Sequence, residues 1–522
     1  MHSLRSGRHD TDLNAAQSEN TVRSAWATQP ASAASSAYQM RCVAAILLTA
    51  VAVKLALVVS VPVTSDECFH WVQGRELAWG FRDHPPGTAA LSWLATAVFG
   101  NTALGVRIVP LLGSFVCSGI AYAMLREVGA DRVRAATGAA FLQLLPMPGV
   151  GMLMVPAVPH APLVFGAELF FLRAMRRGRV GDHVAWGVLL GAAFLTYYLT
   201  AAAVLAAAVF LVRDARGRRV LRDPRLWFGV VVAAAVFAPN LIWNLAQGSH
   251  SAMHFQLLER NDKGLSPKNF AAFVGLASIV AGPLLLPALS RAVRALRSAP
   301  AHADDWRPLF ASFLLVVLAL FAVIATVTRS GAHWAVLAYL NVPVLLFAPG
   351  AEPLARGWSR GALWLGSVLA ATALTVAAVG IERFLAPFVE ASIVSATSRA
   401  RFLHGGDAAV AAHGAALELQ RAGELVQLAS NRWSLSSVLT FHTDGAARFA
   451  VWPPPMRHGR DFQTWNRGSE TPVELIYVTT SPTVEESVRA ASASVRCIAV
   501  IGAPEFAWVH RCSGFVPPAA WR

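Results

Sequence analysis

Charged residues are scarce in this sequence, and lysine is scarcest among them. Only 14% of the 522 residues are charged, whereas an ordinary soluble domain holds roughly 25%. Hydrophobic residues make up 55%, and the mean hydropathy is +0.49. The only lysines are Lys54, Lys263 and Lys268, so arginine supplies almost all of the net charge of +14. This composition excludes a secreted soluble enzyme, a disordered tail protein and a disulfide scaffold, and it indicates a chain whose solvent is lipid.

The first forty residues also lack an apolar run. Residues 1–40 are rich in Ser, Ala, Thr and Arg, which predicts a disordered cytoplasmic N-terminal extension without the apolar core of a signal peptide. Residues 42–63 are apolar apart from Lys54, and this length crosses a hydrocarbon layer of ~30 Å. We predict a polytopic α-helical membrane domain over residues 41–381, with about eleven spans if each needs roughly 20 apolar residues.

The loops between the spans alternate in charge. The basic set comprises 126–134, 173–179, 213–225, 291–307 and 356–360. The other set, which has few cations, comprises 65–86, 159–161, 244–269 and 329–333. The positive-inside rule places the basic set in the cytoplasm. The arginines are therefore interpreted as topology anchors, and no nucleic-acid partner is expected.

Two further features follow from this topology. Residues 184–212 are apolar but flanked by basic loops on both sides, which favours two short helices broken near residues 196–198. The tail, residues 382–522, is predicted to be a small extracytoplasmic α+β domain, with a helix near 408–423 and strands near 474–479 and 497–501. Its Cys497 and Cys512 form either a disulfide or two buried thiols.

Carboxylates are expensive near lipid, which makes those of the loop 65–86 a functional prediction. Asp66 and Glu67 open a segment that suits an amphipathic helix in the membrane interface, with its aromatic side chains toward lipid. The apolar side chains of that segment are Phe69, Trp71, Val72, Leu77 and Trp79. Asp83 and His84 precede two prolines, which force a rigid turn. The loop would gather three carboxylates, His70 and His84 near one pocket; alternatively, Asp66 and Asp83 only cap helices.

Several stretches together carry a resemblance to a known family. They are Asp66-Glu67, Trp79-Gly80, 83–87, 99–100, 106–107, 239–244, 254–256, 259–260, His333-Trp334, 338–339 and 459–465. In order and topology they resemble the polyprenyl-phosphate-dependent GT-C glycosyltransferases. The branch is that of 4-amino-4-deoxy-L-arabinose lipid A transferase, the protein mannosyltransferases and the RgtA/B/C/D enzymes.

The resemblance implies a GT-C fold in a bacterial-type inner membrane. It implies transfer of a sugar from a polyprenyl-phosphate donor to an extracytoplasmic glycolipid, glycan or protein acceptor. By family position, Asp66 would be the general base that takes the acceptor's proton, and Glu67 would orient it or the acceptor. Asp83 and His84 would stand in the family's metal- or phosphate-contacting loop. A single displacement would invert the anomeric centre.

The donor phosphate needs charge-assisted hydrogen-bond donors, for which Arg107, Arg260 and His333 are candidates. Arg107 is also interpretable as an interfacial snorkelling arginine, and Arg260 as part of a solvated ion pair. Trp334 and Tyr339 complete the predicted substrate-binding set, although such aromatics are also typical of membrane-interface belts.

Two positions depart from the family pattern. Relatives carry a Pro-Asp-x-Pro turn where this chain has His160, and a Ser-Lys-Tyr where it has Thr196, Tyr197 and Tyr198. We hypothesise that His160 joins Asp83 and His84 in a divalent metal site, with imidazole shifting the preference from Mg or Mn toward Zn. The alternative is a hydrogen-bonded helix-cap histidine without a metal.

Two other classes of function compete with the transferase. A transporter or flippase of a lipid-linked intermediate would suit broken spans, but its site would lie near the bilayer midplane and often between inverted repeats. The sequence shows no internal repeat, and its acidic groups lie in a surface loop. A catalytically silent relative is the third alternative, which the two departures keep open.

Overall fold

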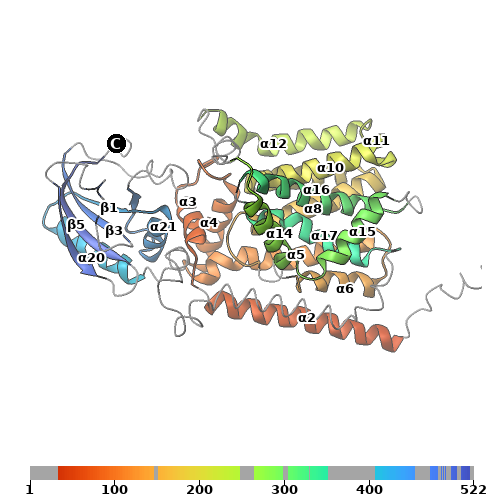
Figure 1. The fold of residues 1–522 in the computed structure, drawn as a ribbon, viewed down its shortest axis with the longest axis horizontal. Helices are drawn as coiled ribbons and strands as arrows, with labels where there is room; N and C mark the ends of the chain where they lie inside the picture. Colours follow the sequence, from red (N-terminus) through yellow and green to blue (C-terminus); the bar gives the residue numbers. More distant parts are fainter. Residues whose placement is uncertain are drawn as a thin grey trace, which may run out of the picture.

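The computed structural model describes residues 33–60, 62–145, 151–246, 264–297, 304–328, 330–350, 406–452, 471–479, 484, 486, 488, 495–502 and 507–517. The candidate Arg260, the predicted span at 361–381 and the stretch 459–465 lie outside these residues. Figure 1 shows two parts, a bundle of helices and a C-terminal α+β domain at one end of it. This confirms the predicted fold class.

The bundle is built from helices of very different lengths. They are α2 (Ala33–Ser60), α3 (Ser65–Gln73), α4 (Gly87–Phe99), α5 (Ala103–Glu127), α6 (Arg132–Leu142), α8 (Ala157–Arg177), α9 (Val180–Thr196), α10 (Ala201–Arg213), α11 (Ala215–Val220), α12 (Pro224–Ala246), α14 (Pro267–Ala281), α15 (Leu285–Arg297), α16 (Arg307–Val327) and α17 (Val336–Phe347). Two 3-10 turns, η1 (Tyr198–Thr200) and η3 (Ala332–Ala335), precede α10 and α17. Helix α2 begins at Ala33, so residues 33–40 are helical and the predicted disordered extension ends too late.

Four of the described helices are long and apolar enough to cross a membrane alone: α2, α5, α12 and α16. A fifth span is possible if α14 and α15, which meet at an angle of 103°, are taken as one broken segment. Shorter apolar helices, among them α4 and α9, fill the bundle between them. Backbone hydrogen bonds inside each helix are what make such segments tolerable in lipid. The number of eleven spans stays a prediction.

Helix α2 carries two cations, the exposed Arg41 near its start and Lys54 in its apolar part, and the bundle buries the second. Lys54 is buried, and its Nζ donates to Ser114 Oγ at 2.6 Å and to Gln143 Oε1 at 2.7 Å. These contacts fix α2 against α5 and the end of α6, along one side of the bundle (Figure 1). An ammonium in this position is stabilised by neutral acceptors instead of facing lipid.

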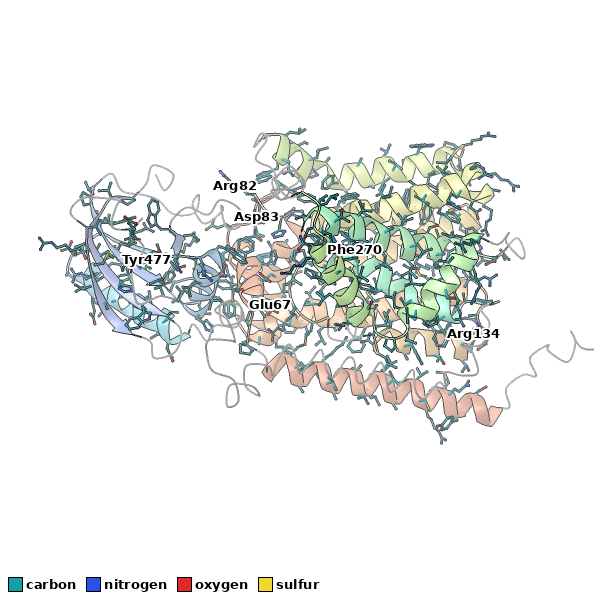
Figure 2. All side chains as sticks on the ribbon, viewed as in Figure 1. Glu67, Arg82, Asp83, Arg134, Phe270 and Tyr477 are labelled. Carbon is teal, nitrogen blue, oxygen red and sulfur yellow. A yellow bond between two sulfur atoms is a disulfide. The ribbon has the colours of Figure 1, made fainter. Side chains whose placement is uncertain are left out.

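Basic and acidic loops lie at opposite ends of the bundle. The arginine-rich helices α11 and α15 lie at the end away from the C-terminal domain (Figure 1). Figure 2 shows Arg134 at that end, and Glu67 and Asp83 at the end facing the domain. The two predicted sets of loops therefore lie at opposite ends of the bundle. Which end faces the cytoplasm stays a prediction.

The predicted break in residues 184–212 is present. Helix α9 ends at Thr196, Tyr197 is extended with φ −157° and ψ 123°, and the chain resumes as η1 and α10. Gly87, the first residue of α4, lies against this break: a Cβ there would stand 2.6 Å from Leu195 O. Thr88 Oγ1 donates to Thr196 O at 3.3 Å, which satisfies one of the carbonyls that the end of α9 leaves open.

Within its described residues, the C-terminal domain contains a five-stranded mixed sheet in the order β2-β1-β3-β5-β4. Its described elements are α20 (Gly406–Arg421), β1 (Val426–Ser430), α21 (Trp433–His442), β2 (Ala450–Val451), β3 (Val473–Thr479), β4 (Arg496–Gly502) and β5 (Trp508–Phe515). Strand β1 pairs in parallel with β2 and β3, while β5 is antiparallel to β3 and β4. Cys497 and Cys512 are register partners on β4 and β5 and form a disulfide.

The core of this domain continues into the membrane domain. One cluster of buried side chains joins α20, α21 and the sheet to α3 and α5. Phe69 and Trp71 of α3 belong to it and are 3% and 1% exposed. The prediction that these aromatics face lipid is therefore wrong: they pack against the C-terminal domain, which sequence periodicity could not anticipate. Helix α3 is also shorter than predicted, since it ends at Gln73 and leaves Trp79 in an irregular loop.

Candidate active site

Helix α3 starts at Ser65 because a capping box precedes it. Thr64 Oγ1 accepts from the Glu67 amide at 3.4 Å, and Glu67 Oε2 accepts from the Thr64 amide at 2.8 Å. This reciprocal arrangement satisfies two of the open amides at a helix start. The alternative in which Asp66 and Asp83 are helix caps is wrong, because Thr64 caps α3 and Pro86 stands at the cap of α4.

Glu67 is also half of a fully buried ion pair with Arg107 of α5. The Arg107 Nε donates to Glu67 Oε1 and its Nη2 to Glu67 Oε2, both at 2.7 Å. The same guanidinium donates to Pro62 O at 2.7 Å and Val58 O at 3.2 Å. The amide of Met154 donates to Glu67 Oε1 at 3.2 Å. Both side chains are 0% exposed, so Arg107 is not a snorkelling arginine, and the pair ties α3 to its neighbours.

Asp66 is the exception on this helix. It is exposed, whereas every other residue of α3, from Ser65 to Gln73, is buried. It stands in the first turn, where the partial positive charge of a helix N-terminus favours an anion. The two adjacent carboxylates therefore have different environments: Glu67 faces a guanidinium inside the protein and Asp66 faces accessible space. We call Asp66, Glu67, His70 and Arg107 the α3 cluster.

The loop after α3 is held by α12. Asn240 Nδ2 donates to Trp79 O at 2.7 Å. The ring of Trp243 and the amide of Asn240 occupy the space where a Cβ on Gly80 would stand, so only glycine permits this approach. Asp83 is buried and His84 half-buried at the far end of the loop. Figure 2 shows Arg82 and Asp83 beside the end of the bundle that meets the C-terminal domain.

The two imidazoles of this region do meet. The rings of His70 and His84 are 5.0 Å apart, and Phe69 contacts both. His70 Nδ1 donates to Gln73 Oε1 at 2.9 Å. Burial lowers the pKa of His70 to about 4, so its ring is neutral at ordinary pH. The predicted single pocket is only partly assembled, because Glu67 binds Arg107 while His70 and His84 contact each other.

The two family departures lie side by side. His160 of α8 contacts the ring of Tyr197 edge-on, with centroids 5.6 Å apart. The hydroxyl of Thr200 donates to Tyr197 O at 2.7 Å and therefore accepts from His160 Nε2 at 2.8 Å. His160 Nδ1 then carries a lone pair, which is buried without a hydrogen-bond partner in the described part of the chain. We call His160, Tyr197, Tyr198 and Thr200 the break cluster.

Tyr198 extends the break cluster to α12. Its hydroxyl donates to Asn240 Oδ1 at 3.0 Å and accepts from Asn244 Nδ2 at 3.1 Å. Asn240 is also the residue that holds the loop at Trp79. The break between α9 and α10 is thus connected through one asparagine to the loop that carries Asp83.

A divalent ion is not supported by this geometry. No group of three or more His, Cys, Asp or Glu side chains is placed to hold a metal ion within the described ranges. Asp83, His84 and His160 are therefore not assembled as a ligand set. His160 is hydrogen-bonded to Thr200 but does not cap a helix, because Pro156 stands at the cap of α8. Because the residues do not fit, no step of the mechanism is assigned to a metal, and a metal cofactor stays a prediction.

The remaining residues predicted to bind the donor differ in how exposed they are. Tyr339 is fully buried, and its hydroxyl donates to Ala332 O at 2.9 Å, joining α17 to η3. His333 on η3 is exposed, and its ring lies 6.2 Å from that of the half-buried Trp334. Arg260 lies outside the described residues. Of the three described residues, His333 is the exposed one.

Comparison with known proteins adds sequence relatives to this geometry. Residues 83–243 match the family of dolichyl-phosphate-mannose-protein mannosyltransferases. The chain is 28% identical over 288 residues to the lipid A galacturonosyltransferase RgtD of Rhizobium johnstonii, covering 54% of this chain and 59% of RgtD. It is 27% identical over 267 residues to the lipopolysaccharide core galacturonosyltransferase RgtB of the same organism, covering 49% and 53%. The chain thus spans little more than half the length of these curated relatives.

Solved structures show the same fold. ArnT from Cupriavidus metallidurans in the apo state superposes with a TM-score of 0.62 at 15% identity, covering 92% of this chain and 99% of ArnT. ArnT bound to undecaprenyl phosphate gives 0.58 at 16% identity with the same coverage. The predicted GT-C fold and the resemblance to the Rgt branch are therefore confirmed. The chain is a multi-pass membrane protein with an ArnT-like architecture.

Proposed function

We propose that this protein is a membrane glycosyltransferase that moves a sugar from a polyprenyl-phosphate donor to an envelope acceptor. The relatives suggest galacturonic acid as the sugar and lipid A or the lipopolysaccharide core as the acceptor. ArnT bound to undecaprenyl phosphate suggests the lipid of the donor. Reaction at the end of the bundle facing the C-terminal domain would lie outside the cytoplasm, since the arginine-rich loops gather at the other end.

The observation that carries this proposal is the contrast between the two carboxylates of α3. Glu67 forms a buried ion pair with Arg107, while Asp66 is the one exposed side chain of the helix. An exposed carboxylate beside the membrane surface is accessible to an acceptor hydroxyl, and a general base must reach the proton that it removes. Asp66 is therefore assigned the role of base, and Glu67 and Arg107 hold the helix that presents it.

The reaction is a single displacement. The acceptor oxygen forms a bond to the anomeric carbon while its proton passes to Asp66. The bond from that carbon to the phosphate oxygen breaks with its electron pair, so polyprenyl phosphate leaves and the anomeric centre inverts. Among the described candidates, the exposed His333 is assigned to the leaving phosphate, because Arg107 is buried and binds Glu67 and two carbonyls.

The test uses Asp66→Asn in the full chain, in cells lacking the native gene. Mass spectrometry of lipid A and core oligosaccharide compares the gene-free, wild-type and variant strains. The wild type is expected to add one sugar to one acceptor, and the variant to lose about 10²- to 10⁴-fold in transfer rate, the contribution typical of a general base. Thermal unfolding in detergent should leave the variant as stable as the wild type, because Asp66 is exposed.

Asp131→Asn is a matched control. Asp131 caps α6 through Arg134 N, in the arginine-rich loop that joins α5 to α6, and asparagine preserves that cap. This variant should transfer at the wild-type rate. Retained transfer by Asp66→Asn would overturn the assignment of the base. If the protein moved the donor lipid across the membrane without removing its sugar, the function would be that of a flippase and not of a transferase.

A further inference from the structure

The C-terminal domain contacts the helix that carries Asp66 directly. Trp433 of α21 packs edge-on against Phe69 with ring centroids 5.2 Å apart, and Phe441 of α21 packs against Trp71 at 5.1 Å. Aromatic pairs in this geometry contribute about 0.5–1.5 kcal/mol each beyond the area that they bury. Both contacts lie on α3 itself, within about one and a half turns of Asp66.

Polar contacts reinforce the aromatic ones around Trp71. Its Nε1 donates to Asn101 Oδ1 at 2.9 Å, and Asn101 Nδ2 donates to Asp444 Oδ1 at 3.2 Å. Arg75 stacks over the Trp71 ring at 4.3 Å and also donates to Asn101. Trp71 is therefore held by the membrane domain and the C-terminal domain at once.

The turn after α21 is shaped for this contact. Asp444 has φ +51°, which is uncommon for a residue other than glycine, and Gly445 follows with φ +76°. A Cβ on Gly445 would lie 3.5 Å from the edge of the Trp71 ring. Beyond the turn, Arg448 forms an ion pair with Glu76, just past the end of α3.

Helix α3 needs such support to hold its position. A nine-residue helix is marginal by itself, because helix nucleation is costly and isolated helices shorter than ~12–15 residues are unstable in water. Irregular segments flank it on both sides. On one side the Glu67–Arg107 pair fixes it to α5, and on another α21 covers its aromatic side chains. Phe69 also contacts His84, which extends the contact to the loop of Asp83.

We propose that α21 of the C-terminal domain, through Trp433 and Phe441, positions α3 so that Asp66 stands at the reacting atoms. This inference rests on the proposed function and makes Trp433 and Phe441 positioning residues. It gives the C-terminal domain a part in turnover, beyond that of a docking site for the acceptor. A misplacement of about 1 Å at a reacting group costs about 10²-fold in rate, so loosening α3 should lower kcat.

The experiment uses full-length protein in lipid nanodiscs, with undecaprenyl-phosphate galacturonic acid as donor probe and purified lipid A as acceptor probe. Trp433→Ala should lower kcat by about 10- to 100-fold while the KM values for both probes stay within about twofold of the wild-type values. Trp433→Phe, which keeps an aromatic ring against Phe69, should restore most of the rate. Hydrogen exchange of the amides in residues 65–73 should accelerate in Trp433→Ala and not in Trp433→Phe.

Trp452→Ala is the matched control. Trp452 packs edge-on against Phe515 on the other side of the sheet and belongs to a separate hydrophobic cluster. This variant should weaken the domain, yet leave kcat and the exchange of residues 65–73 near the wild-type values. The inference is overturned if Trp433→Ala keeps its kcat, if only the KM for lipid A rises, or if Trp452→Ala loses kcat equally. A wild-type chain that protects α3 from exchange but transfers no sugar from any polyprenyl donor would instead overturn the proposed function.

Discussion

In the α3 cluster, a buried carboxylate and a buried guanidinium face each other as ions, and the guanidinium also donates to two backbone carbonyls. In the break cluster, the buried groups are an imidazole, a hydroxyl and a phenol ring, and they make neutral hydrogen bonds. Both clusters hold irregular backbone at an end of a helix. They differ in that the first keeps a charged pair and presents an exposed carboxylate beside it.

This difference indicates where the molecule uses buried charge to hold its backbone in place. A buried ion pair stabilises only if both ions remain and their other hydrogen-bonding atoms are satisfied. The α3 cluster meets that condition through Arg107, Pro62 and Val58. In the break cluster, an acid and a base of the family pattern are both replaced, and no ion pair is needed. The proposed chemistry is therefore assigned to α3, whereas the break cluster is connected through Asn240 to the loop that carries Asp83.

The largest effect is expected when the ion pair of the α3 cluster is broken. Arg107→Met leaves Glu67 buried without its cation, which should cost about 3–5 kcal/mol in the free energy of unfolding. Denaturation in detergent micelles measures it. Replacing both residues, as Glu67→Gln with Arg107→Met, should recover part of the loss. Arg448→Met, which breaks an exposed pair, should cost less than about 1 kcal/mol. An equal loss in Arg107→Met and Arg448→Met would contradict the special importance of the buried pair.

The second prediction introduces charge into the break cluster. His160→Asp buries a carboxylate beside Tyr197 and removes the donor to Thr200, and we expect a loss of about 3 kcal/mol. Adding Tyr197→Lys supplies a cation next to that carboxylate, so the double variant should be more stable than the sum of the single losses allows. A double-mutant cycle measures this coupling. Strict additivity would show that the two departures are independent.

The third prediction concerns pH and His70. The unfolded chain takes up a proton on this imidazole below about pH 6.5, whereas in the folded chain its pKa is about 4. Stability is therefore full above pH 6.5 and falls as pH drops toward 4, by about 2 kcal/mol at pH 5. Thermal unfolding at pH 7 and pH 5 checks this. In His70→Phe the difference should shrink; an unchanged difference would assign the pH dependence to other groups.

The smallest effect is expected at the edge of the break cluster. Tyr198→Phe removes the hydroxyl between Asn240 and Asn244, which should cost about 1 kcal/mol because those two amides still contact each other. Thermal unfolding is the measurement. Tyr38→Phe in α2 is a control, since Tyr38 is 69% exposed. If Tyr198→Phe lost more free energy of unfolding than Arg107→Met, the break cluster would contribute more to stability than the α3 cluster, contrary to the prediction.

Sequence reasoning reached much of this fold because lipid restricts the choices. Apolar runs predict helices wherever backbone groups must be satisfied internally, and the break near Tyr197 followed from the charge of the flanking loops. In the α+β tail, the alternating runs at 474–479 and 497–501 predict β3 and β4 to within a residue of their ends, whereas β1, β2 and β5 are not predicted. These are local patterns, which a single sequence carries.

Tertiary pairings were not visible in the same way. Nothing in the sequence shows that Arg107 pairs with Glu67 or that α21 covers Phe69 and Trp71, because these partners are far apart along the chain. An aromatic stripe on a short helix fits lipid as well as it fits a second domain. The one local signal was the spacing of Thr64 and Glu67, a capping box that would have placed the helix start and assigned Glu67 a structural part.

The packing of the C-terminal domain on α3 also affects when α3 gains its support during synthesis of the chain. The ion pair between Glu76 and Arg448 joins residues 372 positions apart. Ribosomes add about 5–20 residues per second, so roughly 20 to 75 seconds separate the synthesis of these two residues. Until α21 has been made, Phe69 and Trp71 lack the rings of Trp433 and Phe441. A chain interrupted before α21 would carry Asp66 on an unsupported helix, so the proposed transfer would require synthesis to pass α21.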